Sequence, residues 1–297
     1  MSTNVATTVV VGVDGTEDGQ RALLYGVTLA QREGLELRLV HVAHQTEMYA
    51  PMMPYLPEPK VLQIGESVLQ DAQRLAEEAG FDEARTGTVL AHGPRATALL
   101  DHLEDARCLV VGTRPGGMQH LFTGSTTLSL ATRAGVPVHS VPRGWSTTSG
   151  SHHRVVAGLD GSRADADVLE EAFREAGARG SSALRLVHAW RPVSPYDAAI
   201  VRRVLEEDWE SAAREALTKQ IEEVAGHHPG IPWQLELDFD RVTVALHRVA
   251  ADADVLVLGR HSHVPPAGLG IGSNTRTLVR TATCPLVVVP IHSSHPQ

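Results

Sequence analysis

The chain has 297 residues, a length that suggests two domains, each large enough to bury a core of its own. Hydrophobic residues make up 42% and charged residues 21%, and no apolar run approaches the ~18 residues of a membrane span, so a membrane protein and a disordered chain are excluded. With 26 Lys and Arg against 35 Asp and Glu, the net charge is −9, which argues against a nucleic-acid partner.

Short apolar runs rich in β-branched residues alternate with amphipathic stretches along the first half of the chain. The apolar runs predict strands over residues 9–13, 37–42, 87–91, 109–112 and 136–141. Apolar residues at helical spacing predict helices over 18–32, 61–79 and 95–104. Most of these strands are continuous apolar runs, as expected of parallel strands covered on both faces. The order predicts a doubly wound α/β domain, a five-stranded parallel sheet with helices on both faces.

The second half of the chain repeats the first half in the same order. VVVGVDGT at 9–16 returns as VVAGLDGS at 155–162, and CLVVGTR at 108–114 returns as VLVLGRH at 255–261. The offset between matching positions stays at 146 to 148 residues throughout. Internal duplication of this kind indicates two copies of one fold.

The two copies are separated by a Ser-, Gly- and Thr-rich stretch, residues 143–153, which is typical of a linker. We therefore expect two tandem doubly wound domains over residues 1–144 and 152–297. In the second copy, the amphipathic stretch 197–225 predicts a long helix after the second strand.

Candidate binding residues follow the strands, because ligands of open parallel sheets bind beyond the carboxyl ends of the strands. Asp14 and Asp160 follow the first strand of each copy, where a carboxylate would accept a hydrogen bond from a ribose hydroxyl. The alternative is structural: Thr16 or Ser162 caps the next helix, and the Asp orders the turn.

The second strand of each copy ends in a histidine and a small apolar residue, His41-Val42 and His188-Ala189. The backbone at this point would hydrogen-bond the edge of a base, and the apolar side chain would pack on its ring. A histidine held by a structural hydrogen bond is the alternative.

Glycine-containing loops follow the fourth strands, over residues 112–126 and 259–274. Glycines let the backbone approach a phosphate closely, and the N–H groups of a helix that begins at Ser125 or Ser273 favour an anion. The alternative is that Gly-Ser is an ordinary N-cap. Arg114 and Arg260, at matching loop positions, are candidate phosphate partners.

Over nearly its whole length, this arrangement resembles the universal stress proteins in their tandem two-repeat form. An ATP-binding subset of that family carries G-x2-G-x9-G-[ST] after the fourth strand and a nucleotide-contacting Asp at the end of the first. The resemblance implies bound ATP, with Mg²⁺ accompanying it. The implied contacts are Asp14, Val42, Gly112, Gly124 and Ser125 in the first copy, and Asp160, Ala189, Gly259, Gly272 and Ser273 in the second.

Neither copy carries the full glycine motif. In the second copy Ser262 replaces the middle glycine at the family spacing. In the first copy the loop is one residue shorter, and Pro115 occupies the middle position, although Gly116 and Gly117 follow it. Proline has no N–H to donate to a phosphate, so we expect an adenine nucleotide to prefer the second copy.

No catalytic motif stands out, and His261 and His263 have no third ligand at a recognisable spacing, so we expect no metal site. We expect an adenine-nucleotide-binding regulatory protein of the stress response, located in the cytoplasm, without strong catalytic activity. A slow ATP hydrolase and a ligand-free interaction scaffold are the alternatives. A homo-oligomer and an unidentified protein partner stay open.

Overall fold

The computed structural model describes residues 6–43, 57–113, 126–147, 154–180, 183–190, 206–260 and 270–291. The chain divides into two compact units, Met1–Thr147 and Thr148–Gln297. Within the described ranges, no helix combines the length and the apolar character that crossing a membrane requires.

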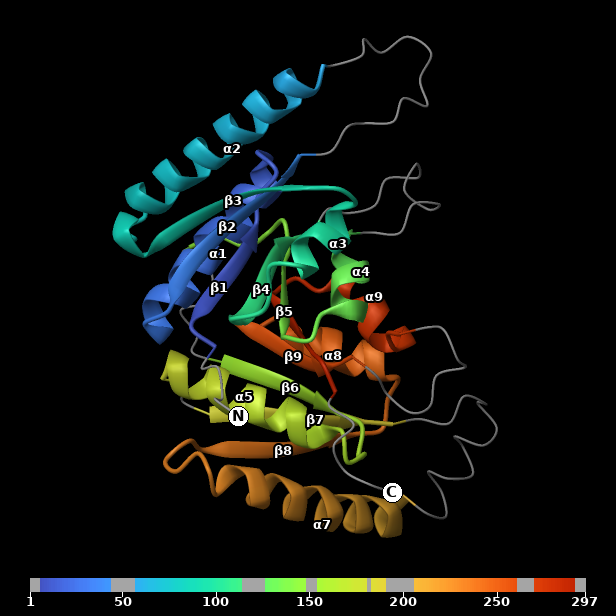
Figure 1. Ribbon diagram of the computed structural model, residues 1–297. Coiled ribbons are helices and arrows are strands. Elements are labelled where there is room, and N and C mark those ends of the chain that lie inside the picture. The colour runs from blue at the N-terminus through green and yellow to red at the C-terminus, as the bar shows by residue number, and fades with distance from the viewer. Residues whose placement is uncertain are drawn as a thin grey trace, which may run out of the picture. The chain divides into compact units, whose positions relative to one another are not determined.

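The first unit is built on a parallel sheet whose strands all come from the predicted apolar runs (Figure 1). These strands are β1 (Thr8–Gly12), β2 (Glu36–Ala43), β3 (Thr86–His92), β4 (Ala106–Gly112) and β5 (Val138–Val141). Their order in the sheet is β3-β2-β1-β4-β5, which confirms the doubly wound arrangement.

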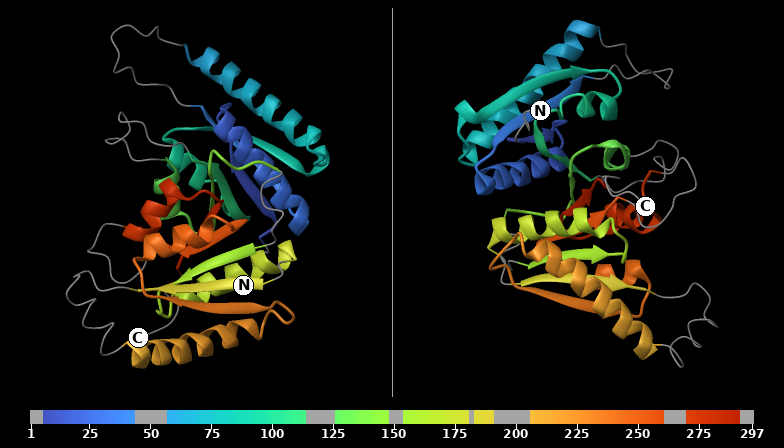
Figure 2. Two further views of the ribbon diagram at one scale, coloured as in Figure 1. Left: turned by 180° about the vertical axis from the view of Figure 1, so that it is seen from behind. Right: turned by 60° about the horizontal axis from the view of Figure 1, so that its bottom comes forward.

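Helices cover both faces of this sheet. They are α1 (Glu17–Glu33), α2 (Glu58–Glu78), α3 (Arg95–Leu100) and α4 (Thr126–Arg133), with a short 3-10 turn at Glu83–Arg85. Val9 and Val11 of β1 belong to the core formed with α1 and α2, whereas Val10 belongs to the core formed with α3 and α4. This alternation explains why β1 reads as an unbroken apolar run. Figure 2 shows α2 lying along the part of the sheet formed by β2 and β3.

The second unit repeats the pattern. Its parallel strands are β6 (Arg154–Leu159), β7 (Ala183–Ala189), β8 (Trp233–Asp238), β9 (Val255–Gly259) and β10 (Leu286–Val289), in the order β10-β9-β6-β7-β8. Its described helices are α5 (Asp165–Arg179), α7 (Glu206–Ala225), α8 (Val242–Ala250) and α9 (Ser273–Thr281). The fully buried Phe173 of α5 and Ile221 of α7 pack into one core against β6, while α8 and α9 contact each other.

Three predicted boundaries differ from the structure. The helix expected over 95–104 ends at Leu100, because the next N–H, that of His102, donates to Leu99 O at 3.3 Å and so closes a three-residue turn instead of continuing the helix. The strand expected from residue 136 begins at Val138, since Pro137 has no N–H for the ladder. Trp145, in the predicted linker, is buried and packs edge-on against Tyr25, with the ring centroids 5.3 Å apart.

The remaining differences concern coverage. Of the long helix expected over 197–225, the structure describes α7 from Glu206 onward, and residues 197–205 lie outside the described ranges. Both cysteines, Cys108 and Cys284, are buried, and burial raises the pKa of the Cys284 thiol to about 12.

Candidate functional site

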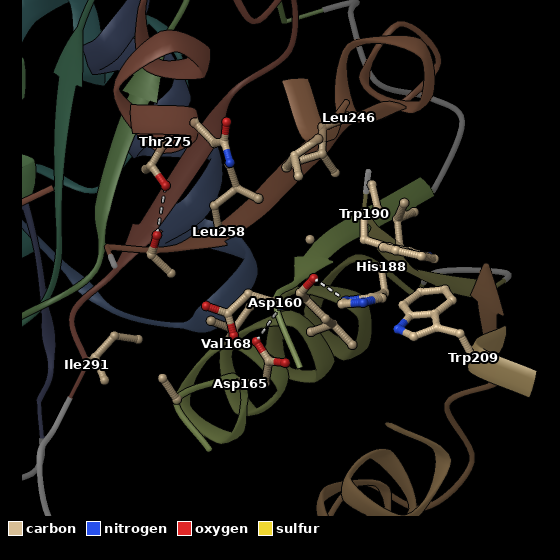
Figure 3. Close-up of a pocket in the computed structure, with 18 residues that line it drawn as sticks. Asp160, Asp165, Val168, His188, Trp190, Trp209, Leu246, Leu258, Thr275 and Ile291 are labelled. Atoms are coloured by element: carbon tan, nitrogen blue, oxygen red, sulfur yellow. Dashed lines mark hydrogen bonds between the residues drawn. The ribbon is translucent and has the colours of Figure 1, made fainter. Parts of the chain in front are cut away.

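A cavity of about 520 Å³ opens at the carboxyl ends of β6, β7 and β9 in the second unit (Figure 3). The strand order reverses at this point, because β7 lies on one side of β6 and β9 on the other. Doubly wound folds bind their ligands at such a reversal. Apolar side chains from several elements form much of the wall, among them Val168 of α5, Leu246 of α8 and Leu258 of β9.

Two carboxylates meet at this cavity. Asp160 follows β6, and its Oδ1 accepts the N–H of Ser162 at 2.8 Å. Asp165, the first residue of α5, accepts the N–H of Asp160 at 3.1 Å and the N–H of Gly161 at 2.8 Å. Gly161 has a φ of +82°, a conformation that favours glycine. The Asp165 carboxylate therefore anchors the turn that carries Asp160.

The environment of Asp165 disfavours its charged form. Burial and then the charge of Asp160 raise the pKa of Asp165 to about 7, although the two backbone N–H donors favour ionisation. Only 3% of Asp165 is exposed. The site therefore favours the protonated, uncharged form of Asp165 more than an exposed position would.

His188 of β7 lies beside the same turn. Its Nδ1 donates to Leu159 O at 3.0 Å, because a carbonyl oxygen can only accept. Burial lowers the pKa of His188, so the neutral ring is favoured. In the first unit, His41 Nδ1 makes the matching bond to Val13 O at 2.8 Å. In both units, this histidine makes the structural hydrogen bond that the sequence offered as the alternative.

The start of α9 is tied to the end of β9. The N–H of Gly272 donates to Arg260 O at 2.9 Å, and Thr275 Oγ1 donates to Gly259 O at 3.0 Å. Asn274 and Thr275 line the cavity. The positive end of the α9 dipole therefore lies at the cavity, where it favours an anionic group.

In the first unit, Asp14 orders its own turn. Its Oδ1 accepts the N–H of Thr16 at 3.1 Å and the hydroxyl of Thr16 at 2.5 Å. Thr16 Oγ1 in turn accepts the N–H of Gly19 at 3.2 Å and so caps α1. This is the structural alternative that the sequence left open for Asp14.

Gly112, at the end of β4, has a packing reason to be glycine. A Cβ at this position would lie 2.4 Å from the backbone oxygen of Asp18, so no larger residue fits without moving α1. Thr127 Oγ1 donates to Gly112 O at 3.3 Å, which matches the bond between Thr275 and Gly259 in the second unit.

A family model described as the universal stress protein family matches residues 6–142 and 151–290. The chain belongs to the universal stress protein family. A universal stress protein of Mycobacterium tuberculosis strain H37Rv is 29% identical over 289 residues, which span 94% of this chain and 96% of that protein. One from Mycolicibacterium smegmatis is 26% identical over 288 residues, 95% of this chain and 96% of that protein.

The fold of the family extends over both units. The crystal structure of a universal stress protein from Archaeoglobus fulgidus DSM 4304 matches with a TM-score of 0.73 and 17% sequence identity. The match covers 98% of this chain and 99% of that one.

In this universal stress protein, the second set of predicted contacts converges. Asp160, Ala189 and Gly259 line the same cavity. Gly272 and Ser273 are the N-cap and the first residue of α9, directly before the lining residues Asn274 and Thr275.

The first set of predicted contacts is described only in part. Asp14, Val42 and Gly112 lie at or just after the ends of β1, β2 and β4. Gly124 and Ser125 lie outside the described residues, as do Arg114 and the Pro115–Gly117 segment of the first loop and 261–263 of the second.

Asp165, Trp190 and Trp209 are three of the cavity residues that the sequence did not predict. Two of them carry a signal in the repeat. Asp165 stands where the first copy has Gly19, and Trp190 stands where it has Ala43. Where the two copies differ near a predicted contact, one site has a side chain that the other site lacks. Trp209 carries no such signal, because it reaches the cavity from α7.

Proposed function

We propose that this protein binds an adenine nucleotide, ATP, in the cavity of the second unit and acts as a nucleotide-dependent regulator in the stress response. One observation carries the proposal. Asp160, Ala189 and Gly259, chosen from the sequence because of the family resemblance, line a single cavity at the point where the strand order reverses.

The size and chemistry of the cavity support this assignment. Its volume of about 520 Å³ lies within the roughly 300–1,000 Å³ of small-molecule sites. The apolar walls suit a planar base, and the Asp160 carboxylate suits a ribose hydroxyl. The N-terminus of α9 suits a phosphate. The proposal assigns no catalytic residue, so binding without turnover is its expected outcome.

Calorimetric titration with ATP and AMP, with and without Mg²⁺, tests the proposal on the full-length protein. Gly272→Val is the informative variant, because Gly272 has a φ of −61° and a ψ of 150°, which valine adopts without strain. Its branched side chain would keep a phosphate from the start of α9. The matched control is Gly124→Val, at the equivalent position of the first copy.

We expect saturable ATP binding by the parent protein, loss of at least tenfold in affinity in Gly272→Val, and retention of the tight site in Gly124→Val. No binding by the parent, or equal affinity in Gly272→Val, would contradict the proposal. Steady phosphate release during the titration would instead favour the ATP hydrolase.

A further inference from the structure

The second unit gathers aromatic rings beside the cavity. Trp190 directly follows β7, Trp209 lies in the first turn of α7, and Phe239 follows β8. The ring centroids of Trp190 and Trp209 are 3.7 Å apart, and Phe239 packs edge-on against Trp190 at 4.9 Å. Trp209 also stacks on His188, with the centroids 5.7 Å apart and the planes inclined by 23°. These contacts hold the indoles in place.

Both tryptophans line the cavity and are only half-buried. Figure 3 shows them on the side of the cavity where His188 lies, with Thr275 and Ile291 on the opposite side. An indole presents a large, rigid apolar face at little cost in conformational entropy, and a second planar ring packs well against such a face. The partly exposed indole surface therefore offers a place for a flat ligand group.

The charges around the cavity narrow the class of ligand. Among the described residues that line it, the ionisable side chains are Asp160, Asp165 and His188. Burial lowers the pKa of His188, which favours the neutral ring on the aromatic side of the cavity. The carboxylates, by contrast, attract hydroxyl or amino donors. A nucleoside has both features that this cavity favours, an uncharged planar ring and hydroxyl donors beside it.

We infer that Trp209, supported by Trp190, is the stacking surface for the base of the bound nucleotide, so that the cavity recognises the nucleoside part of its ligand. This inference rests on the nucleotide binding proposed above. The two units differ at this point, because the first copy has Ala43 where Trp190 stands and so lacks the supporting ring.

The test compares Trp209→Leu with Trp209→Phe in calorimetric titrations with adenosine and with ATP. Stacking on an aromatic side chain affects the base alone, so Trp209→Leu should weaken both ligands by the same factor, about 5- to 100-fold. Trp209→Phe keeps a ring and should stay within about threefold of the parent. Trp233→Phe is the control, because Trp233 packs beside the core under α5 and α7 and is not among the residues that line the cavity.

A fluorescence titration covers the case in which Trp209→Leu does not fold. Adenosine should quench the tryptophan emission of the parent and of Trp233→Phe, and much of that quenching should disappear in Trp209→Phe. Equal quenching in all three proteins would overturn the inference.

The outcomes separate the two proposals. If the parent binds neither adenosine nor ATP, both the nucleotide function and the stacking role fail. If the parent binds them and Trp209→Leu binds them equally well, the stacking role alone fails. A loss that affects ATP but not adenosine would also overturn the stacking role, since it would indicate a phosphate contact.

Discussion

The two units build the same Asp-Gly turn in two different ways. In the first unit Gly19 lies against Asp14, and a Cβ there would come within 2.6 Å of the Asp14 carboxylate. In the second unit the equivalent residue is Asp165, whose own carboxylate takes the N–H groups of Asp160 and Gly161. The first turn thus holds one carboxylate, and the second holds two.

The two copies share the positions of their strand ends and differ in the side chains found there. The strands of the two units end within one residue of matching positions, and the Thr127 and Thr275 hydroxyls donate to matching glycine carbonyls. The side chains at those ends, however, differ in charge and size. The backbone therefore determines where a ligand can bind, and single substitutions determine what each end can hold. Variants at these positions test the comparison directly.

The largest effect is expected at Gly112, where the first unit has no room for a side chain. Gly112→Ala would bring a Cβ to 2.4 Å from the Asp18 backbone oxygen, and α1 would have to shift. We expect the free energy of unfolding to fall by roughly 2–4 kcal/mol, measured by urea denaturation. Gly135→Ala is the control, because a Cβ there meets nothing within 4 Å and should change stability by about 1 kcal/mol at most. Equal effects of the two variants would contradict the packing role.

The second carboxylate should give the second unit a distinctive pH dependence. The pKa of Asp165 is about 7 in the folded chain, against an ordinary value of 3.8, so the folded state binds more protons between these two pH values. The contribution of Asp165 to stability is therefore fully present below about pH 4 and is lost as the pH rises through about 7.

Asp165→Asn removes this titration. Relative to the variant, the parent should lose on the order of 2–4 kcal/mol between about pH 4 and pH 8. Urea denaturation followed by tryptophan fluorescence suits the measurement, since Trp190, Trp209 and Trp233 report on the second unit. A difference between parent and variant that stays constant with pH would contradict the assignment. Asp14→Asn, at the exposed turn of the first unit, is the matched control.

A smaller difference is expected at the two hydroxyl residues of the turns. Thr16 caps α1 by accepting the N–H of Gly19, so Thr16→Ala should cost about 1 kcal/mol of stability. Ser162 is not the N-cap of α5, which begins after Ala164; its Oγ accepts the N–H of Ala164 at 3.2 Å in the turn before the helix, and Asp165 accepts the N–H groups of Asp160 and Gly161. Ser162→Ala should therefore cost about half as much or less. Equal costs in chemical denaturation would show that the two turns do not differ in this way.

The sequence predicted the fold because the order of strands and helices follows from the pattern of apolar residues along the chain. Buried parallel strands such as β1 and β9 are unbroken apolar runs, and the repeat places each strand twice. The ends of elements were less accurate. Leu100 ends α3 through a local turn, and Pro137 delays β5, and neither effect is visible in apolar periodicity.

The sequence predicted only those residues of the candidate site that stand at the end of a strand. Asp160, Ala189 and Gly259 come directly at strand ends, so the topology alone brings them together. Trp209 reaches the cavity from α7, and its proximity to His188 follows from how that helix packs. The raised pKa of Asp165 depends on burial, which is a property of the folded chain.

Amide hydrogen exchange of the full-length protein, with and without saturating ATP, is the most direct test of a nucleotide site in the second unit. We expect slower exchange at the strand ends of this unit, around residues 160–161, 188–190 and 272–275. Little change is expected at the equivalent positions of the first unit, around residues 14–16, 41–43 and 112–113. Slower exchange at the first set of strand ends alone, or no change anywhere in the chain, would contradict the assignment of the nucleotide site to the second unit.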